Sequence, residues 1–343
     1  MRRVYVGIDI GSKSCAAAVR NSRGKVIEKC EFPTSEKGLI ELVSEQNAEV
    51  HVMFEESELA GWAYRTLLPH AERVMACDPV TNAWIAKGKK KSDPIDAAKL
   101  SELLRLGSFN AVYHPPGSLM TDFKVIVQSY ERASKRLARA KVQIKAAFRR
   151  QGVIISGTRV YGAKGREEAL ALVKSEPIRQ MLLSEYEGMD FLAEQKAKAL
   201  RLVKASAGQI PEIERITTVP GVGVILASKF VAYVADPNRF NRKGLIAYSR
   251  LGIVKRESSG SVLCREHLDN AGNGVLKDVS RKAFDAANRM RDNGVKRSYE
   301  SSLKRTGNHT HARLNTQRKI LWIMNVVWRD GTEYRDELVG KGA

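Results

Sequence analysis

The order of strand-like and helical patterns at the N-terminus restricts most strongly how this chain can fold. Three short apolar runs, separated by the small turns GSK and SRGK, predict a β-meander. A helix with Thr34 or Ser35 as its N-cap follows, and then strands and helices alternate. This order predicts a mixed five-stranded sheet flanked by helices. The expected strands are 3–10, 14–20, 25–32, 49–56 and 72–77, and the expected helices after the first cover 59–69 and the segment from residue 93.

The first strand carries a carboxylate, Asp9, inside the stretch VGIDIGSKS. An apolar run of this kind is typical of a strand buried on both faces, where an unpaired charge is costly. Gly7 and Gly11 would let a phosphate or a metal ion approach the backbone beside it. Asp9 is therefore either a structural carboxylate that accepts backbone hydrogen bonds or part of a functional site. Mixed sheets of this order occur in RNase H-like folds and in actin-like ATPase domains.

A second acidic site ends the strand EVHVMFEE. Neighbouring strand residues point to opposite faces, so only one of Glu55 and Glu56 can share a face with Asp9. We favour Glu55, because its neighbour Phe54 belongs with the apolar layer, and Glu56 remains the alternative.

Asp93 and Asp96 lie three residues apart at the start of a predicted helix and therefore share one of its faces. Capping by Ser92 or Asp93, with Pro94 in the first turn, explains part of this pattern. It does not explain the preceding lysine run KGKKK or the number of acids. Four carboxylates on two strands and a helix N-terminus could hold two Mg²⁺ ions about 3.5–4 Å apart for phosphoryl transfer. They are Asp9, Glu55, Asp93 and Asp96.

The net charge of the chain indicates a polyanionic partner. Lys and Arg number 58 against 38 Asp and Glu, which leaves a net charge of +20. Nucleic acid is a better match for this excess than a membrane surface. No long apolar run and no secretory signal is evident, so we expect a cytoplasmic, nucleoid-associated protein with no membrane partner. Four cysteines without C-x-x-C spacing favour reduced thiols over zinc or disulfides.

The middle of the chain predicts a long paired helix. Apolar and small residues repeat at spacings of three and four, which is typical of a coiled-coil seam about four heptads long. Its partner would be a helix at roughly 183–206 of the same chain or the equivalent helix of another subunit, and 152–168 would be a hinge or linker. Nine Lys and Arg residues on the outer face could follow a nucleic-acid backbone. The seam consists of Phe123, Ile126, Tyr130, Ala133, Leu137, Ala140, Ile144 and Ala147.

Two further motifs lie toward the C-terminus. In VPGVGVILASKF, Gly221 and Gly223 predict a helix–hairpin–helix whose backbone N–H groups hold a DNA phosphate, and a purely structural turn is the alternative. In KRESSGSV, Ser258 and Ser259 lie in an expected flexible loop, where solvated serines are the commoner interpretation.

The stretches GIDIGSKS, FEES…GWAYRTLL, CDPVTNAWIA and KKSDPIDAAKLSELL resemble the successive motifs of the DEDD transposases, an insertion-sequence family with a RuvC-like catalytic domain that includes the Piv-type invertases. Residues 215–262 resemble the family's C-terminal transposase domain. The resemblance implies an α/β RNase H-like (RuvC-like) domain followed by mainly helical parts. The expected divisions are a DEDD domain at 1–112, a coiled-coil domain at 113–210, a C-terminal domain at 211–330 and a tail at 331–343.

The resemblance also implies a mechanism. Asp9, Glu55, Asp93 and Asp96 would bind Mg²⁺, and a serine would attack DNA to give a 5′-phosphoserine intermediate. Counting from Leu251 and the AGN stretch selects Ser258, which we favour slightly, whereas counting from the Ser-Gly pair selects Ser259. Relatives often carry a Ser-Lys pair before Gly-Asn, but this chain has LDNAGN.

The partners that the resemblance implies are donor and target DNA, a structured noncoding bridge RNA, and further copies of the chain as homodimers that assemble to a tetramer on DNA. Two other functions remain open. A RuvC-like nuclease or Holliday-junction resolvase would use the same acids with water as nucleophile. An actin-like kinase or ATPase would share GIDIGSKS, but it would need a second Asp-Gly-Gly motif, which this sequence lacks.

Overall fold

The computed structural model describes residues 2–79, 92–258 and 261–340, with the side chains of Ser118 and of residues 255–266 left out. The lysine run before residue 92 and the candidate Ser259 therefore lie outside the described residues. The chain divides into two compact units, residues 1–121 and 122–343, which are described separately.

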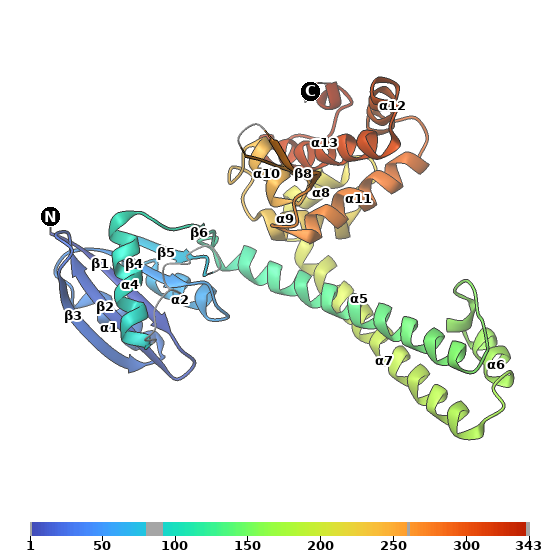
Figure 1. Cartoon of the computed structure of the whole chain (residues 1–343), viewed down its shortest axis with the longest axis horizontal. Coiled ribbons are helices and arrows are strands. Elements are labelled where there is room, and N and C mark those ends of the chain that lie inside the picture. The colour runs from blue at the N-terminus through green and yellow to red at the C-terminus, as the bar shows by residue number, and fades with distance from the viewer. Residues whose placement is uncertain (1, 80–91, 259–260, 341–343) are drawn as a thin grey trace. The chain divides into compact units, whose positions relative to one another are not determined.

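The first unit is built on one six-stranded sheet of order β3-β2-β1-β4-β5-β6 (Figure 1). β1, β2 and β3 form an antiparallel meander, β4 and β5 run parallel to β1, and β6 is antiparallel to β5. The five predicted strands are all present, and the sixth was missed because it has only two residues. The strands are β1 Arg3–Ile10, β2 Ser14–Asn21, β3 Val26–Pro33, β4 Glu49–Glu55, β5 Arg73–Cys77 and β6 Ala111–Val112.

Helices cover both faces of this sheet. α1 (Glu36–Ser44) and α2 (Ala60–Leu67) share one core with the apolar faces of β1, β2 and β4. α4 (Asp93–Leu106) packs on the opposite face, where Leu100 contacts a cluster that includes Met53. Ser35, not Thr34, caps α1, because its side chain accepts a hydrogen bond from the Gly38 N–H. This mixed sheet with helices on both faces is consistent with the expected RNase H-like domain.

The second unit begins within the first turn of α5 (Ser118–Arg150), which with α7 (Glu176–Ala207) forms a pair of long helices (Figure 1). The short helices η1 (Arg159–Tyr161) and α6 (Ala163–Ala171) connect them; η1 lies within the predicted hinge at 152–168, and α6 begins within it. Leu137 and Ile144 of the predicted seam share a core with Leu182 and Tyr186 of α7, so the seam pairs within the chain over this half.

The other half of the predicted seam was partly wrong. Val127 and Glu131 are buried there, where Ile126 and Tyr130 were expected. The reason is that this part of α5 faces α9 (Val224–Val234): the Glu131 carboxylate forms a 3.0 Å ion pair with Lys229. A change of partner along a helix shifts which residues are buried, and a strict repeat does not anticipate it.

The rest of the second unit packs around α13 (His309–Asp330), which contacts α8, α10, α11, α12 and α14. KRESSGSV was wrongly expected as a flexible loop: β7 and β8 form an antiparallel hairpin in which Ser258 pairs with Ser261. Strand-forming Ile253, Val254 and Val262 account for this. Among the described residues, no helix combines the length and hydropathy needed to cross a bilayer. The remaining elements are α8 Pro211–Thr217, α10 Arg242–Tyr248, β7 Ile253–Ser258, β8 Ser261–Leu268, α11 Gly274–Arg289, α12 Gly294–Thr306 and α14 Glu337–Gly340.

Candidate active site

The close crossing of α4 over β1 builds the candidate site. A Cβ atom added to Gly7 would lie 2.1 Å from the Ala97 carbonyl oxygen of α4, so only glycine allows the helix to pack this closely. Asp9 follows Gly7 by two residues and lies on the same face of the strand. Asp93 and Asp96 precede Ala97 at the start of α4. The crossing therefore brings the acidic N-terminus of the helix toward Asp9.

The electrostatics of Asp9 show that these carboxylates are neighbours. Burial raises the pKa of the half-buried Asp9 carboxyl, and the negative charges of Asp93 and Asp96 raise this pKa further. Within the described residues, no group donates a hydrogen bond to Asp9, whereas Asp96 forms a 2.9 Å ion pair with Lys99. Asp9, Asp93 and Asp96, which we name the carboxylate cluster, thus hold negative charge that is only partly compensated.

The sheet register places Glu55 on the face that carries Asp9. Ile8 pairs with Phe54 in the parallel ladder of β1 and β4, so the next positions along the two strands are Asp9 and Glu55. Met53, two residues before Glu55, packs on α4. Residues that alternate along a strand share a face, so Glu55 lies on the side of the sheet that α4 covers.

Glu56 has different surroundings. Its carboxylate lies 2.7 Å from the His114 Nε2, and the His114 ring stacks on Tyr64 with 5.3 Å between ring centroids. The Glu56 N–H donates to the Cys77 carbonyl. These contacts hold Glu56 just after the C-terminal end of β4.

The carboxylate cluster fits a hard cation by its chemistry. Among the described residues, no three His, Cys, Asp or Glu side chains already converge as a ligand set. The cluster nevertheless offers only carboxylate oxygens, the ligands that Mg²⁺ prefers. A half-buried carboxylate with like charges beside it is stabilised when a cation approaches, because the cation removes the repulsion that raises the Asp9 pKa.

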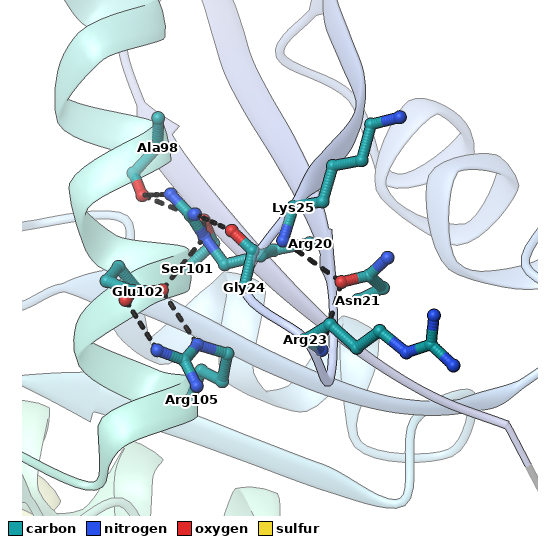
Figure 2. Close-up of polar contacts among 9 residues, drawn as sticks. All are labelled: Arg20, Asn21, Arg23, Gly24, Lys25, Ala98, Ser101, Glu102 and Arg105. Atoms are coloured by element: carbon teal, nitrogen blue, oxygen red, sulfur yellow. Dashed lines mark hydrogen bonds and ion pairs between the residues drawn. The ribbon is translucent and has the colours of Figure 1, made fainter.

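A polar clamp that sequence reasoning missed holds α4 on the sheet (Figure 2). Arg20 of β2 donates to the Ala98 carbonyl at 3.1 Å and to the Ser101 hydroxyl at 3.3 Å, and it forms a 3.2 Å ion pair with Glu102. Arg105 bonds the same carboxylate through two nitrogens. The Arg20 side chain is only 15% exposed, so the clamp is largely shielded from water. The arginine that ends the apolar run CAAAVR was the available sequence signal.

The candidate serines belong to the second unit. Ser258 is the last residue of β7, and its pairing with Ser261 places it at the far end of the hairpin from Ile253. We name β7 and β8 the serine hairpin. Its base is fixed by a hydrogen bond from the Asp269 N–H to the Gly252 carbonyl and by one from Arg318 Nε to the Leu251 carbonyl, both 2.9 Å.

The two glycines of the turn between α8 and α9 have different roles. Gly221 has φ +80°, and a Cβ atom there would lie 2.2 Å from the Ala283 carbonyl oxygen of α11, so this glycine is required for packing. Gly223 is the N-cap of α9 and has open space beside it. Backbone N–H groups at such a helix start can receive a phosphate. Sequence reasoning also missed that Asn273 of LDNAGN caps α11 by accepting from two backbone N–H groups.

Comparisons with known families agree with this arrangement. Residues 6–151 match the model of the IS110-type DEDD transposases, described as a transposase, and residues 213–300 match the model described as transposase IS116/IS110/IS902 family. No curated protein matched the chain. The first match includes the carboxylate cluster and the second includes the serine hairpin, which confirms the resemblance drawn from the motifs. The chain belongs to the IS110 family of DEDD transposases, enzymes that act on DNA as transposases and recombinases.

Proposed function

We propose that this chain is the Mg²⁺-dependent, site-specific recombinase of an insertion sequence, that a serine is its nucleophile, and that a structured noncoding bridge RNA guides it. The observation that carries the metal-dependent part is the carboxylate cluster at the crossing of α4 and Gly7. Glu55 is the proposed fourth carboxylate. The serine nucleophile and the bridge RNA are carried over from the family resemblance. The net charge of +20 supports a nucleic-acid partner.

The proposed reaction exchanges one phosphate ester for another. The Ser258 or Ser259 oxygen forms a bond to a DNA phosphorus, the bond from that phosphorus to the 3′ oxygen breaks, and the 3′ oxygen gains a proton as the serine loses one. The products are a 5′-phosphoserine and a free 3′-hydroxyl. Asp9, Glu55, Asp93 and Asp96 would hold the metal, which when bound would supply Lewis acidity that lowers the pKa of the attacking hydroxyl and stabilises negative charge on the leaving oxygen and the phosphate oxygens.

The proposed partners are donor and target DNA, the bridge RNA and other copies of the chain. Exposed Arg132, Lys135, Arg136 and Arg139 give one side of α5 a basic surface suited to a phosphate backbone. Gly223 at the start of α9 is a second proposed phosphate contact. Homodimers that assemble to a tetramer on two duplexes complete the proposal.

Asp9→Asn tests this function, with Glu58→Gln as the control because Glu58 is an exposed acid outside the cluster. Both variants should bind DNA and RNA as the parent does. Asp9→Asn should lose Mg²⁺-dependent strand cleavage by about a thousandfold or more, and the control should keep it. Sequencing of RNA that co-purifies with the parent should give one discrete species. Full cleavage by Asp9→Asn would overturn the metal assignment, and the absence of a discrete RNA would overturn the guide.

A further inference from the structure

A cavity of about 460 Å³ between α10, α12 and α13 is lined by cations and hydroxyls. Arg242 comes from α10, Arg305 from α12, and Arg318 and Lys319 from α13. Three serines of α12 and Asn315 supply neutral hydrogen-bonding groups, and no acidic residue is among the described residues that line the cavity. We name this the cation cavity. Its composition differs from that of an ordinary ion-pair network, in which acids alternate with bases.

The positive charges of the cation cavity are not neutralised within the described residues. Other arginines of this unit have carboxylate partners, such as Arg281 with Asp278 and Arg329 with Asp330, but none of the four cavity cations forms an ion pair there. Burial lowers the pKa of Lys319, and the charges of Arg242 and Arg305 lower it further. Arg242, Arg318 and Lys319 are partly buried and Arg305 is exposed, and like charges that converge in this way are unfavourable until an anion joins them.

We propose that the cation cavity binds a backbone phosphate of the nucleic acid on which the enzyme acts. Guanidinium groups and hydroxyls together match the several acceptor oxygens of a phosphate, and arginine is well suited to this recognition. That the cavity takes an anion follows from its own residues. That the anion belongs to nucleic acid rests on the proposed function, and the phosphate could come from DNA or RNA.

The cation cavity lies beside the base of the serine hairpin, so a phosphate bound there would affect how nucleic acid is positioned. Arg318 also lines a neighbouring cavity of about 340 Å³ with Ile253, His267 and Leu268 at the base of the serine hairpin. The same side chain donates to the Leu251 carbonyl just before β7. A phosphate held beside Arg318 therefore lies next to the base of the serine hairpin. Because phosphate contacts set the register of a protein on nucleic acid, this contact would position the strand relative to the hairpin.

The test compares two double variants of the full chain that remove the same charge. The cavity variant, Arg305→Gln with Lys319→Gln, removes two of the four positive charges that line the cation cavity. Lys304→Gln with Arg313→Gln removes two exposed cations from the same helices outside it. Calorimetric titration with inorganic pyrophosphate should show binding to the parent and the control and about tenfold weaker binding to the cavity variant. If circular dichroism shows that the cavity variant is unfolded, Arg242→Gln takes its place. This single variant should also bind pyrophosphate more weakly than the parent does.

A second measurement separates the two sources of phosphate. The salt dependence of binding is measured for a duplex DNA and for an RNA of the same sequence. The cavity variant should lose about one unit of slope for the nucleic acid that occupies the cavity, and the control should lose less. Unchanged pyrophosphate binding by the cavity variant would overturn the anion site. Weaker pyrophosphate binding with both slopes unchanged would overturn its assignment to nucleic acid. Neither readout requires cleavage, so an inactive parent would count against the proposed function alone.

Discussion

Gly7 and Asp9 lie two residues apart on β1, on the face that α4 covers, and they contribute differently to the candidate site. Gly7 must lack a side chain because the Ala97 carbonyl occupies the place where a Cβ atom would lie. Asp9 carries a carboxylate whose charged form is disfavoured by its surroundings, since burial and two neighbouring acids raise its pKa. One residue lets the helix approach, and the other meets the negative charge that the helix brings. A carboxyl whose pKa is raised by burial and by neighbouring acids is common at functional sites.

Gly7→Ala should destabilise the first unit by about 1–3 kcal/mol, because the added methyl group must push α4 away from β1. Gly188→Ala is the matched control: Gly188 lies in α7 with nothing near its missing Cβ, so alanine there should stabilise the protein by roughly 0.5–1 kcal/mol. Urea denaturation measures both changes. Equal stability of Gly7→Ala and the parent would contradict the close crossing.

The raised Asp9 pKa predicts how stability depends on pH in the absence of metal. A carboxyl whose pKa is higher in the folded than in the unfolded state lowers folding stability as pH rises from the ordinary value of 3.8 through the raised one. Asp9→Asn removes this loss, so in EDTA its Tm should exceed that of the parent at neutral pH, and the difference should shrink on acidification toward the ordinary value.

The effect of Mg²⁺ on the Tm tests whether Asp9 takes part in metal binding. Mg²⁺ at a hundredfold excess over its Kd should stabilise the parent by about 2.7 kcal/mol and Asp9→Asn by much less. Glu58→Gln should respond to the metal as the parent does. An equal gain in Tm for Asp9→Asn and the parent would show that Mg²⁺ binds elsewhere.

At the scale of elements, the pairing of α5 with α7 decides which part of the predicted seam is buried. Ile144 is fully buried between these helices, whereas Val142, two residues away, is 62% exposed. Ile144→Asp should therefore cost about 3 kcal/mol or more, and Val142→Asp should cost little. Because the pairing lies within one chain, the loss measured by urea denaturation should not depend on protein concentration. A loss that diminishes at high concentration would indicate pairing between subunits at this position.

Local sequence patterns predicted the helices and strands well, but they did not predict the contacts between them. The five longer strands, the acidic start of α4 and the two long helices follow from alternation, caps and periodicity, which act over a few residues. The clamp between Arg20 and Ser101 joins residues 81 positions apart. The ion pair of Glu131 with Lys229, to which the Tyr233 hydroxyl adds a 2.6 Å hydrogen bond, likewise depends on tertiary packing. Neither leaves a periodic signal in the sequence, so the predicted seam did not include Glu131.

At the scale of the whole molecule, the candidate chemistry is divided between two compact units. The carboxylate cluster lies in the first unit, and the serine hairpin and the cation cavity lie in the second. The candidate acids and the candidate serines could be proposed from the sequence because each lies within a recognisable stretch. The cation cavity could not, because its four cations come from three helices that only the fold brings together.

We propose that Ser258 or Ser259, not water, attacks DNA. The most direct measurement is mass spectrometry of the parent protein after reaction with a nicked suicide substrate that traps the covalent intermediate. We expect a DNA 5′-phosphate attached to Ser258 or Ser259. The alanine variant of that serine should lose this adduct and recombination, and alanine at the other serine should have a milder effect. If DNA is cleaved at the parent rate by both alanine variants and no adduct forms, water is the nucleophile and the enzyme acts as a resolvase-like nuclease.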